Sequence, residues 1–496
     1  MKKLRFILAA TAALLLPAGV FAQSWDLLIS SPEDEVPACA IENSFGNYLV
    51  CGTIGSQITW EYDGYVAEIS PTGALLNEKR FSNPLNFLVF MDIIEVSGGY
   101  LVFGRGWEDS TFAPRSATVV KKLDYDLNEL WSKYYKTGSC SETVQNTRRM
   151  DDGTFAGIGL CTAMNATTEV LFYRFDQNGD TLDAKVLKSG SPLLFNERGW
   201  DVLDNGDSGY KIFTRNYPDT VLFAGITYYV ANLDSNLNLI SFKSLSEGTF
   251  PAPWSSRFEA PFSAKWLNDS VYMVAGRVYW NPDTIFPFSN SEFEIGLVFY
   301  SQDDSVLSYH RFGKVDSSDV PAQIQVMDFV YRDAIYVGGN SANPPGNALS
   351  LFKLDSTGAL LWKKYYGQDY YALFHVLATQ DSGCLLVSYI DNGNDRDIYI
   401  IKVGPDGVFV PGIETTVLPE AAYKVFPNPA SGYFYIQGSF ALPAVLELYD
   451  ITGRKIIRQQ VTSNKQQINV GKLVAGIYIY RLLSDGKAGR GKIVLK

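Results

Sequence analysis

Apolar and polar residues alternate along most of the chain in short segments that end at tight turns. Residues 353–367, KLDSTGALLWKKYYG, are one example: an apolar strand ends at Asp355, the chain turns, and a second strand begins before Trp362. Alternation with a period of two residues between turn signals is typical of half-buried β-strands. No long window has the three- and four-residue apolar spacing of a helix, so the pattern predicts an all-β protein.

This strand–turn–strand segment is repeated along the chain. In KLDYDLNELWSKYY, Asp124 and Trp131 have the same spacing as Asp355 and Trp362. Five weaker copies begin at Glu68, Arg174, Asn232, Phe299 and Lys402. Each copy follows a shorter turn and another apolar strand, so one unit contains four antiparallel strands. Seven such units predict a seven-bladed β-propeller, because a single blade leaves two faces and two edges uncovered.

The last copy predicts how the ring closes. Its fourth strand is interrupted at Pro411-Gly412, and proline cannot donate a ladder hydrogen bond. Trp25, in SWDLLIS, lies 21 residues before the next turn glycine, as Trp362 does. We therefore expect the segment around Trp25 to pair as an outer strand with residues 398–403 of the last blade.

The repeated turn has a structural and a functional interpretation. Its pattern, Asp-x-x-Gly-x-x-x-Trp, resembles the Asp-box of sialidase-like propellers and the tryptophan-docking repeat of quinoprotein-like propellers. It lacks the leading Ser of the first and has one residue fewer than the second. Asp and Gly are the residues that a tight turn requires, so we interpret the repeat as a structural turn rather than a catalytic loop.

From Tyr423 the pattern changes to seven short alternating strands. They are YKVFP, YFYIQG, AVLELYDI, RKIIRQQV, QQINV, GIYIYRLLSD and GRGKIVLK. Seven strands in so short a segment predict a small immunoglobulin-like β-sandwich. We expect residues 23–412 to form the propeller, 413–422 a linker and 423–496 the sandwich.

Several motifs follow one another in this C-terminal segment: VFPNPASGYFYI, LELYDITGRKI, LVAGIYIYRL and the terminal KIVLK. Their distinguishing residues are Pro427, Asn428, Pro429, Asp450, Gly453, Gly476, Tyr478 and Lys492. The segment resembles the type A C-terminal sorting domain of the type IX secretion system. The resemblance implies that the secretion machinery carries the chain across the outer membrane of a Gram-negative cell, and that its sortase removes the domain. The product would stay at the cell surface or be released. The alternative is an ordinary sandwich that binds a ligand.

Residues 1–22 have the pattern of a secretory signal peptide. Lys2, Lys3 and Arg5 precede a short apolar core, and small residues end the segment before Gln23. The apolar run is too short to span a bilayer. We expect an exported chain with no transmembrane segment after cleavage.

Composition argues against two classes of partner. The net charge is −11, and loss of the three basic residues of the signal peptide makes it −14. A protein this acidic repels phosphate backbones and anionic membrane surfaces, so we expect it to bind neither nucleic acid nor membranes.

Five cysteines follow the signal peptide. Cys39 and Cys51 flank one predicted hairpin, and Cys140 and Cys161 flank another, so each pair is a candidate disulfide in an exported protein. The alternative is that all five are small buried residues, because spacing does not fix geometry. We expect Cys384 to be unpaired and buried. With no C-x-x-C pair and two His residues, the sequence predicts no zinc site and assigns no metal or cofactor.

The loops between the second and third strands of the predicted blades are long, dissimilar and rich in aromatic residues. Variation at one face of a repeat array marks a binding face. Flat rings beside polar groups suit stacking on sugars or anchoring of a protein, whereas the alternative is packing of loop against loop. The candidate ligand-binding residues are Trp60, Tyr62, Trp107, Tyr217, Trp254, Trp280 and Phe286.

Residues 391–397, DNGNDRD, contain oxygen ligands of the kind that Ca²⁺ prefers: Asp391, Asn394, Asp395 and Asp397. The segment departs from the loop pattern of calcium-binding hands, and we interpret it as a solvated acidic loop.

Groups of catalytic residues are scarce. A Ser-His-Asp triad requires His310 or His375, which the pattern places on a fourth and a first strand rather than on a shared loop. Spacing cannot select a carboxylate pair from 53 acidic residues, so a secreted glycan hydrolase or lyase is the alternative function. We favour a non-catalytic module that binds a glycan or a protein, and assign no catalytic residue. An enzyme should instead gather charged groups with perturbed pKa values at the channel mouth.

Overall fold

The computed structural model describes residues 24–409 and 423–496 with internal gaps. The gaps are residues 57–58, 60, 84, 108–115, 139, 164–167, 188–194, 207–208, 218–226, 246–253, 281–291, 314–317, 344–345, 394, 451–454 and 485–486. The regular elements of the described residues are all β-strands, so the predicted all-β class is confirmed. No helix in this part of the chain is long and apolar enough for a membrane crossing. The predicted signal peptide and linker lie outside the described residues.

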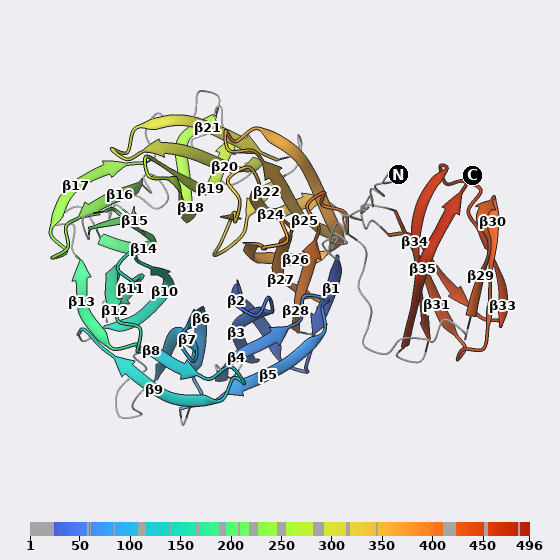
Figure 1. Ribbon diagram of the computed structural model, residues 1–496, viewed down its shortest axis with the longest axis horizontal. Helices are drawn as coiled ribbons and strands as arrows, with labels where there is room; N and C mark the ends of the chain where they lie inside the picture. Colours follow the sequence, from blue (N-terminus) through green and yellow to red (C-terminus); the bar gives the residue numbers. More distant parts are fainter. Residues whose placement is uncertain are drawn as a thin grey trace, which may run out of the picture.

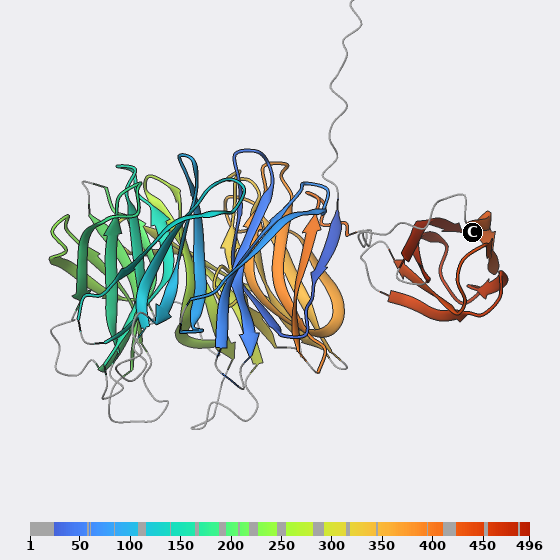
Figure 2. The ribbon, with the colours of Figure 1, turned by 90° about the horizontal axis from the view of Figure 1, so that it is seen from below.

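Antiparallel sheets form seven blades around a central channel (Figure 1), and the strands run along the axis of the ring (Figure 2). In each blade the first strand faces the channel and the fourth lies on the outer rim. The first blade contains β2 (Asp34–Glu42), β3 (Tyr48–Ser56), β4 (Glu61–Ile69) and β5 (Leu75–Phe81). The second contains β6 (Leu88–Val96), β7 (Gly99–Trp107), β8 (Ser116–Leu123) and β9 (Glu129–Tyr135). The third contains β10 (Ser141–Arg149), β11 (Phe155–Thr162), β12 (Thr168–Phe175) and β13 (Thr181–Leu187).

The remaining blades follow the same order, with one strand shared between the last two. The fourth contains β14 (Phe195–Asp204), β15 (Tyr210–Tyr217), β16 (Thr227–Leu233) and β17 (Leu239–Ser244). The fifth contains β18 (Trp254–Asn268), β19 (Val271–Trp280), β20 (Glu292–Ser301) and β21 (Val306–Phe312). The sixth contains β22 (Asp319–Pro321), β23 (Met327–Asp328), β24 (Ile335–Asn343), β25 (Gly346–Leu354) and the start of β26 (Leu360–Ala378). The end of β26 is the first strand of the seventh blade, followed by β27 (Cys384–Asp391) and β28 (Arg396–Val403).

The N-terminal strand completes the seventh blade. β1 (Trp25–Ile29) is antiparallel to β28, with Trp25 opposite Lys402 and Ile29 opposite Ile398. The predicted closure of the ring is therefore confirmed. It joins segments that lie at the two ends of the propeller sequence.

The repeated Asp turns are held by local hydrogen bonds. Asp355 Oδ1 accepts from the backbone N–H groups of Thr357 (2.8 Å) and Ala359 (3.0 Å). Asp124 Oδ1 accepts from the N–H of Asn128 at 2.8 Å in the same way. Side-chain hydrogen bonds from Thr357 and Asn128, together with the backbone N–H groups, lower the pKa of the two aspartates because they favour the carboxylate. The repeat is therefore a structural turn.

The fourth strand of one blade docks on the turn of the next. The ring of Trp131 lies on Gly179, and that of Trp362 lies on Gly407. Trp362 Nε1 also donates to the carbonyl of Pro405 at 3.1 Å. Both glycines have positive φ, and a Cβ on Gly179 would lie 2.6 Å from the Trp131 ring. The close approach of the ring explains why these turns contain glycine.

Two turns use leucine in place of glycine. Leu127 and Leu237 both have positive φ and are buried. The docked side chain is then small and polar: Asn77 Nδ2 donates to a backbone carbonyl of the Leu127 turn at 2.8 Å. The position that corresponds to Trp131 in the third blade, before the Leu237 turn, is Asp183. At these four turns, either an aromatic ring of the preceding blade or the leucine of the turn itself packs between the two blades.

Replacing Gly179 by Ala should destabilise the protein more than replacing Gly46 by Ala. Both glycines have positive φ, which costs a residue with a Cβ about 1 kcal/mol. Nothing lies within 4 Å of a Cβ on Gly46, whereas the Trp131 ring must move for a Cβ on Gly179, at a further cost of about 1–3 kcal/mol. Chemical unfolding of both variants measures the difference. An equal decrease in the free energy of unfolding in both variants would show that the Trp131 ring moves aside without cost.

The junction between the fourth and fifth blades contains buried charges. Asp304, at the positive-φ position of its turn, accepts from Lys211 Nζ (2.6 Å), Asn232 Nδ2 (2.7 Å) and Tyr272 Oη (2.8 Å). The side chains of Lys211 and Asp304 are 1% and 5% exposed. This cluster occupies the place of the ring or leucine at the other junctions.

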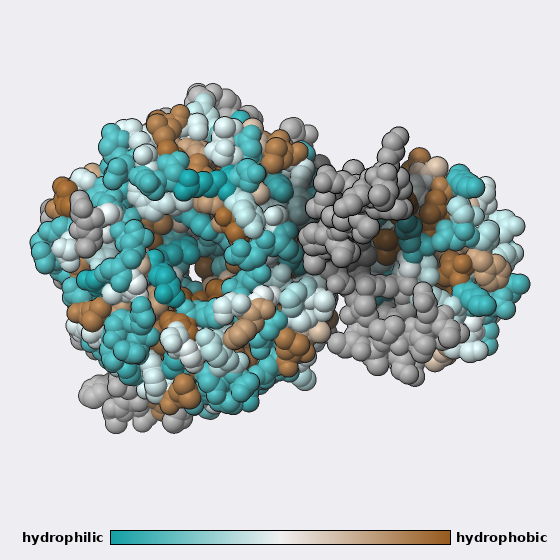
Figure 3. Space-filling view, viewed as in Figure 1, coloured by the Kyte–Doolittle hydropathy of each residue, from teal (hydrophilic) through white to brown (hydrophobic). Residues whose placement is uncertain are grey.

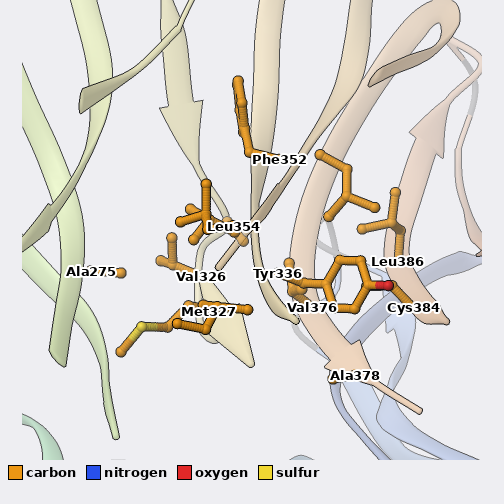
Figure 4. Packing of buried hydrophobic residues seen from close by; sticks show 14 of the residues in the cluster. Ala275, Val326, Met327, Tyr336, Phe352, Leu354, Val376, Ala378, Cys384 and Leu386 are labelled. Atoms are coloured by element: carbon orange, nitrogen blue, oxygen red, sulfur yellow. The ribbon is translucent and has the colours of Figure 1, made fainter. Parts of the chain in front are cut away.

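Apolar side chains fill the spaces between neighbouring blades. In the largest cluster Ala275 of the fifth blade, Met327 and Leu354 of the sixth, and Cys384 and Leu386 of the seventh pack together (Figure 4). Cys384 is free and buried, as predicted. The blades are thus held mainly by burial of apolar surface between sheets.

The cysteine predictions have different outcomes. Cys140 and Cys161 form a disulfide with a Cα–Cα distance of 5.5 Å. Cys39 and Cys51 lie directly opposite each other on β2 and β3, but both are free thiols, so the predicted bond between them is wrong. The Sγ of Cys39 instead donates to Asp92 Oδ1 of the second blade at 2.9 Å.

Residues 423–496 form a separate β-unit with all seven predicted strands. They are β29 (Tyr423–Ser431), β30 (Tyr433–Gly438), β31 (Ala444–Asp450), β32 (Lys455–Val461), β33 (Lys465–Asn469), β34 (Gly476–Ser484) and β35 (Lys487–Leu495). The strand order is β32-β31-β34-β35-β29-β30-β33. Asn428 of β29 contacts β35 through Nδ2 to Lys492 O (2.7 Å) and Oδ1 to Val494 N (3.0 Å). The immunoglobulin-like topology stays a prediction.

Candidate functional site

Six inner strands have a β-bulge at the same position. The residues that follow the bulges are Cys39, Asp92, Asn146, Asp201, Ser263 and His375. A bulge re-aims the side chain beside it. Asp92 Oδ2 accepts from the N–H of Thr147 in the next blade at 2.6 Å, and Asp201 Oδ2 accepts from Ala264 N at 2.8 Å. Asp92 and Asp201 therefore join their inner strands to those of the next blades.

One arginine spans the channel. Arg148 on β10 donates to both carboxylate oxygens of Asp201, from Nε and Nη2, at 3.0 Å each. Its Nη2 also donates to Gln325 Oε1 of the sixth blade at 2.9 Å. Since the third and sixth blades lie on different sides of the ring, this side chain crosses the interior. Figure 3 shows the hollow at the centre of the ring, which is bordered by hydrophilic residues and some hydrophobic ones.

The channel contains two groups with strongly perturbed pKa values. Burial raises the pKa of Asp92 to about 6. Burial lowers the pKa of His375 to about 4, and the nearby charge of Asp328 partly opposes this shift. Both Asp92 oxygens accept hydrogen bonds from the protein, from Cys39 and from backbone N–H groups. The geometry therefore assigns Asp92 to the joining of blades.

The stability of variants should depend on pH in opposite directions. The folded-state pKa of Asp92 is raised from 3.8 to about 6, so its contribution is complete below pH 3.8 and is lost as pH rises through 6. The folded-state pKa of His375 is lowered from 6.5 to about 4, so its contribution is present above pH 6.5 and is lost as pH falls through 4. Between pH 4 and 6, Asp92→Asn should make the free energy of unfolding rise more steeply with pH than in the wild type, and His375→Gln should make it rise less steeply. Denaturant unfolding across this range tests both, and curves parallel to that of the wild type would contradict the assignment.

Five of the seven predicted aromatic residues lie at strand ends on one side of the ring. Trp107 and Tyr217 end second strands, Tyr62 lies at the start of a third strand, and Trp254 pairs with Trp280 between β18 and β19. In an antiparallel blade these ends share one edge. The side chains of Tyr217, Trp254 and Trp280 are not among those described, and Trp60 and Phe286 lie outside the described residues.

Tyr62 and Trp107 come together in one depression of about 460 Å³, between the seventh, first and second blades. Phe87 stacks on Trp107, with ring centroids 4.6 Å apart and an interplanar angle of 14°. Tyr62 meets Phe87 edge-on at 5.9 Å. The depression is lined by Asp34, Val36, Thr53, Tyr62, Phe87, Val89, Arg105, Trp107, Ser116, Ser141 and Arg396.

A short loop holds these rings in place. Asn83 Nδ2 donates to the carbonyls of Phe87 (2.9 Å) and Trp107 (3.1 Å). The N–H of Trp107 donates to Phe87 O at 3.1 Å, and the N–H of Tyr62 donates to Asn86 O at 2.9 Å. The three rings are therefore fixed through the backbone, which lowers the entropy lost when a ligand binds.

The depression contains a guanidinium group that is partly buried. Arg105 lies 5.3 Å above the Phe87 ring, its Nε has no hydrogen-bond partner, and no described residue forms an ion pair with it. Burial lowers its pKa, a shift that Tyr62 partly opposes. Arg277 occupies the same position in the fifth blade, above the Phe293 ring at 4.8 Å. Arg105, which has no carboxylate partner among the described residues, is therefore suited to an anionic ligand.

Arg396 adds a second cation to the same depression. Its Nε lies 3.7 Å from Asp391 Oδ2, and its guanidinium lies 5.1 Å from the Tyr389 ring centroid. Its backbone N–H donates to Asp34 Oδ1 at 3.1 Å. The depression therefore combines aromatic rings, two arginines and one carboxylate.

Sequence reasoning missed Phe87, Arg105 and Arg396. Arg105 had a usable signal, because it is the one charged residue in the apolar strand GYLVFGRGW. Phe87 lies after a turn in sequence, and only the folded loop stacks it on Trp107.

The acidic segment 391–397 is bonded within itself. Asp391 Oδ1 accepts from Gly393 N at 2.9 Å, and Asn392 Nδ2 donates to Asp395 and Asp397. Asn394 is outside the described residues. Across the described ranges, no three His, Cys, Asp or Glu side chains are grouped so that they could hold a metal ion.

Several solved structures are similar to the chain in architecture. A polysaccharide lyase of family PL25, an ulvan lyase bound to -[GlcA(1-4)Rha3S]-, has 9% sequence identity and a TM-score of 0.47, with 76% of this chain and 96% of that chain covered. The β-propeller domain of the trilobed protease from Pyrococcus furiosus has 9% identity and a TM-score of 0.40, with coverage of 78% and 96%. An α-L-arabinanase from Penicillium chrysogenum, complexed with arabinobiose, has 11% identity and a TM-score of 0.43, with coverage of 77% and 98%. Among curated proteins, none matches the sequence.

The C-terminal unit matches a protein family. Residues 424–496 fit the model of the secretion system C-terminal sorting domain. Asn428, which links β29 to β35, is one of the residues that carried this resemblance in the sequence. Such a domain implies interaction with the type IX secretion machinery and export to the cell surface or the extracellular space. Residues 424–496 thus belong to the family of secretion system C-terminal sorting domains.

Proposed function

We propose that the chain is an exported, non-catalytic propeller that binds an acidic glycan in the depression around Trp107. The observation that carries this proposal is the position of Arg105, a partly buried cation beside a stacked pair of rings. Aromatic rings provide flat faces for sugar rings, and an arginine binds a carboxylate or sulfate with two parallel hydrogen bonds. The sorting domain supports delivery of this surface to the outside of the cell.

An enzyme that uses carboxylates is the alternative. The perturbed pKa values of Asp92 and His375 favour it. The hydrogen bonds of Asp92 and the crossing of the channel by Arg148 favour binding instead, because both groups are already hydrogen-bonded to other protein groups.

An array of neutral and uronate-containing oligosaccharides, with release of products monitored in parallel, tests the proposal. Wild-type protein should bind acidic glycans without cleaving them. Trp107→Ala should weaken the binding of all ligands. Arg105→Gln should weaken the binding of acidic ligands about tenfold or more, since a hydrogen bond to a charged group contributes about 1.5–3 kcal/mol. Tyr370→Ala and Arg332→Gln replace exposed residues outside the depression and should leave binding unchanged.

Two results would contradict the proposal. Equal affinity for neutral and acidic glycans in wild type and in Arg105→Gln would exclude the role of the arginine. Cleavage that disappears in Asp92→Asn or His375→Gln would establish the enzyme alternative.

A further inference from the structure

Two junctions between blades are filled by a pair of aromatic side chains. Between the second and third blades these are Trp131 and Tyr135 of β9, and Tyr135 Oη donates to Gly179 O at 2.8 Å. Between the sixth and seventh blades, Trp362 and Tyr366 of β26 occupy the same positions, and Tyr366 Oη donates to the turn carbonyl there at 3.0 Å.

The junction between the third and fourth blades lacks both rings. β13 has Asp183 and Leu187 where β9 has Trp131 and Tyr135. The turn carbonyl that a tyrosine would contact, that of Leu237, accepts instead from Lys185 Nζ at 3.2 Å. A cavity of about 400 Å³ remains at this junction.

The walls of this cavity are apolar and its rim carries one cation. Ile212, Leu233 and Leu237 are buried in the wall, and Leu239 and Phe242 stand at the rim with exposed fractions of 52% and 39%. Lys185 is the one charged residue among the lining side chains that are described. Thr214 and Asn238 are the other polar residues of the lining. A cavity whose walls are mainly apolar accepts aromatic molecules. Its size is that of a small-molecule pocket.

We propose that the cavity between the third and fourth blades binds a small aromatic acid, whose ring takes the place of the tyrosine ring at the equivalent junctions, because Leu187, at the position of Tyr135, lines the cavity. The carboxylate of the ligand lies at the rim, where Lys185 Nζ binds it. The chemistry of the occupant follows from the repeat itself, because the same turn and strand geometry holds an indole and a phenol elsewhere in the ring. This site is separate from the depression around Trp107, so neither proposal depends on the other.

Saturation-transfer NMR and calorimetry with indole-3-acetate, indole and cyclohexylacetate test the proposal on the full chain. Indole-3-acetate should bind best, indole more weakly, and cyclohexylacetate about tenfold or more weaker than indole-3-acetate, a difference of about 1.4 kcal/mol. Lys185→Met should remove the preference for indole-3-acetate over indole without abolishing indole binding.

Filling the cavity from within provides the decisive variant. Leu187→Tyr supplies the ring that Tyr135 and Tyr366 provide at their junctions, so it should abolish binding and raise the midpoint of thermal unfolding. Leu182→Tyr makes the same change at an exposed position of β13 and should leave binding unchanged. If Leu187→Tyr loses its unfolding transition, Ala231→Leu, which fills the opposite wall, replaces it. The proposal would be overturned if the wild type did not bind indole-3-acetate, or if the folded cavity-filling variant bound it as well as the wild type does.

Discussion

Replacing Trp25 by Ala should lower the free energy of unfolding of the propeller by about 3–5 kcal/mol, the range for loss of a buried tryptophan. Trp25 is 2% exposed, its Nε1 donates to Pro71 O at 2.8 Å, and its ring lies on Gly73 of the first blade. Its strand also completes the seventh blade. One side chain therefore contributes both to the closure of the ring and to the contact between the blades at the seam.

Deleting residues 24–30 should have a still larger effect, because it leaves the outer edge of β28 without a partner strand. Leu28→Ala is the matched control, since Leu28 lies on the same strand with 52% of its surface exposed. Urea unfolding followed by tryptophan fluorescence and circular dichroism compares the three variants. A deletion variant as stable as the wild type would show that the ring does not need this strand.

Replacing Asp304 by Ala should also cost about 3–5 kcal/mol, because it leaves the ammonium group of Lys211 buried without an anion. The two groups are 2.6 Å apart, and neither is accessible to solvent that could screen the remaining charge. Tyr272 and Asn232 lose their acceptor in the same change. The free energy of unfolding from denaturant titration measures the loss.

The double variant Lys211→Met with Asp304→Leu should recover much of that stability, because two apolar groups replace the pair and no charge remains buried. Leucine is compatible with the backbone at residue 304, since Leu127 and Leu237 have similar positive φ at the equivalent positions. Asp303→Ala, at the exposed neighbouring position, should have no measurable effect. If the single variant Asp304→Ala were as stable as the wild type, the ion pair would not contribute to stability.

The blades and their closure could be predicted because the signals are local and repeated. The turns at Asp124, Asp176, Asp234 and Asp355 are built by hydrogen bonds that reach only four residues along the chain, so their shared pattern can be recognised in the sequence. The count from Trp25 to the next turn glycine then placed the first strand correctly.

The contents of the junctions could not be predicted in the same way. Asp304 looks like a variant turn residue in sequence, and its partner Lys211 comes from another blade. Cys39 and Cys51 were correctly placed opposite each other, but Asp92, 53 residues away, binds the sulfur of Cys39. The depression around Trp107 also depends on tertiary contacts, since Arg396 reaches it from the last blade of the ring. Such contacts leave no periodic pattern.

The pairing of β1 with β28 also constrains how the molecule reaches its native state. Trp25 pairs with Lys402. Nearly the whole propeller is therefore synthesised before β1 can pair with β28. Contacts of such high sequence separation slow folding, because the entropy of a very long loop is lost before the contact forms. Until then an apolar strand and an open sheet edge are both exposed, and a chaperone that shields the leading segment during transport would act on this interval.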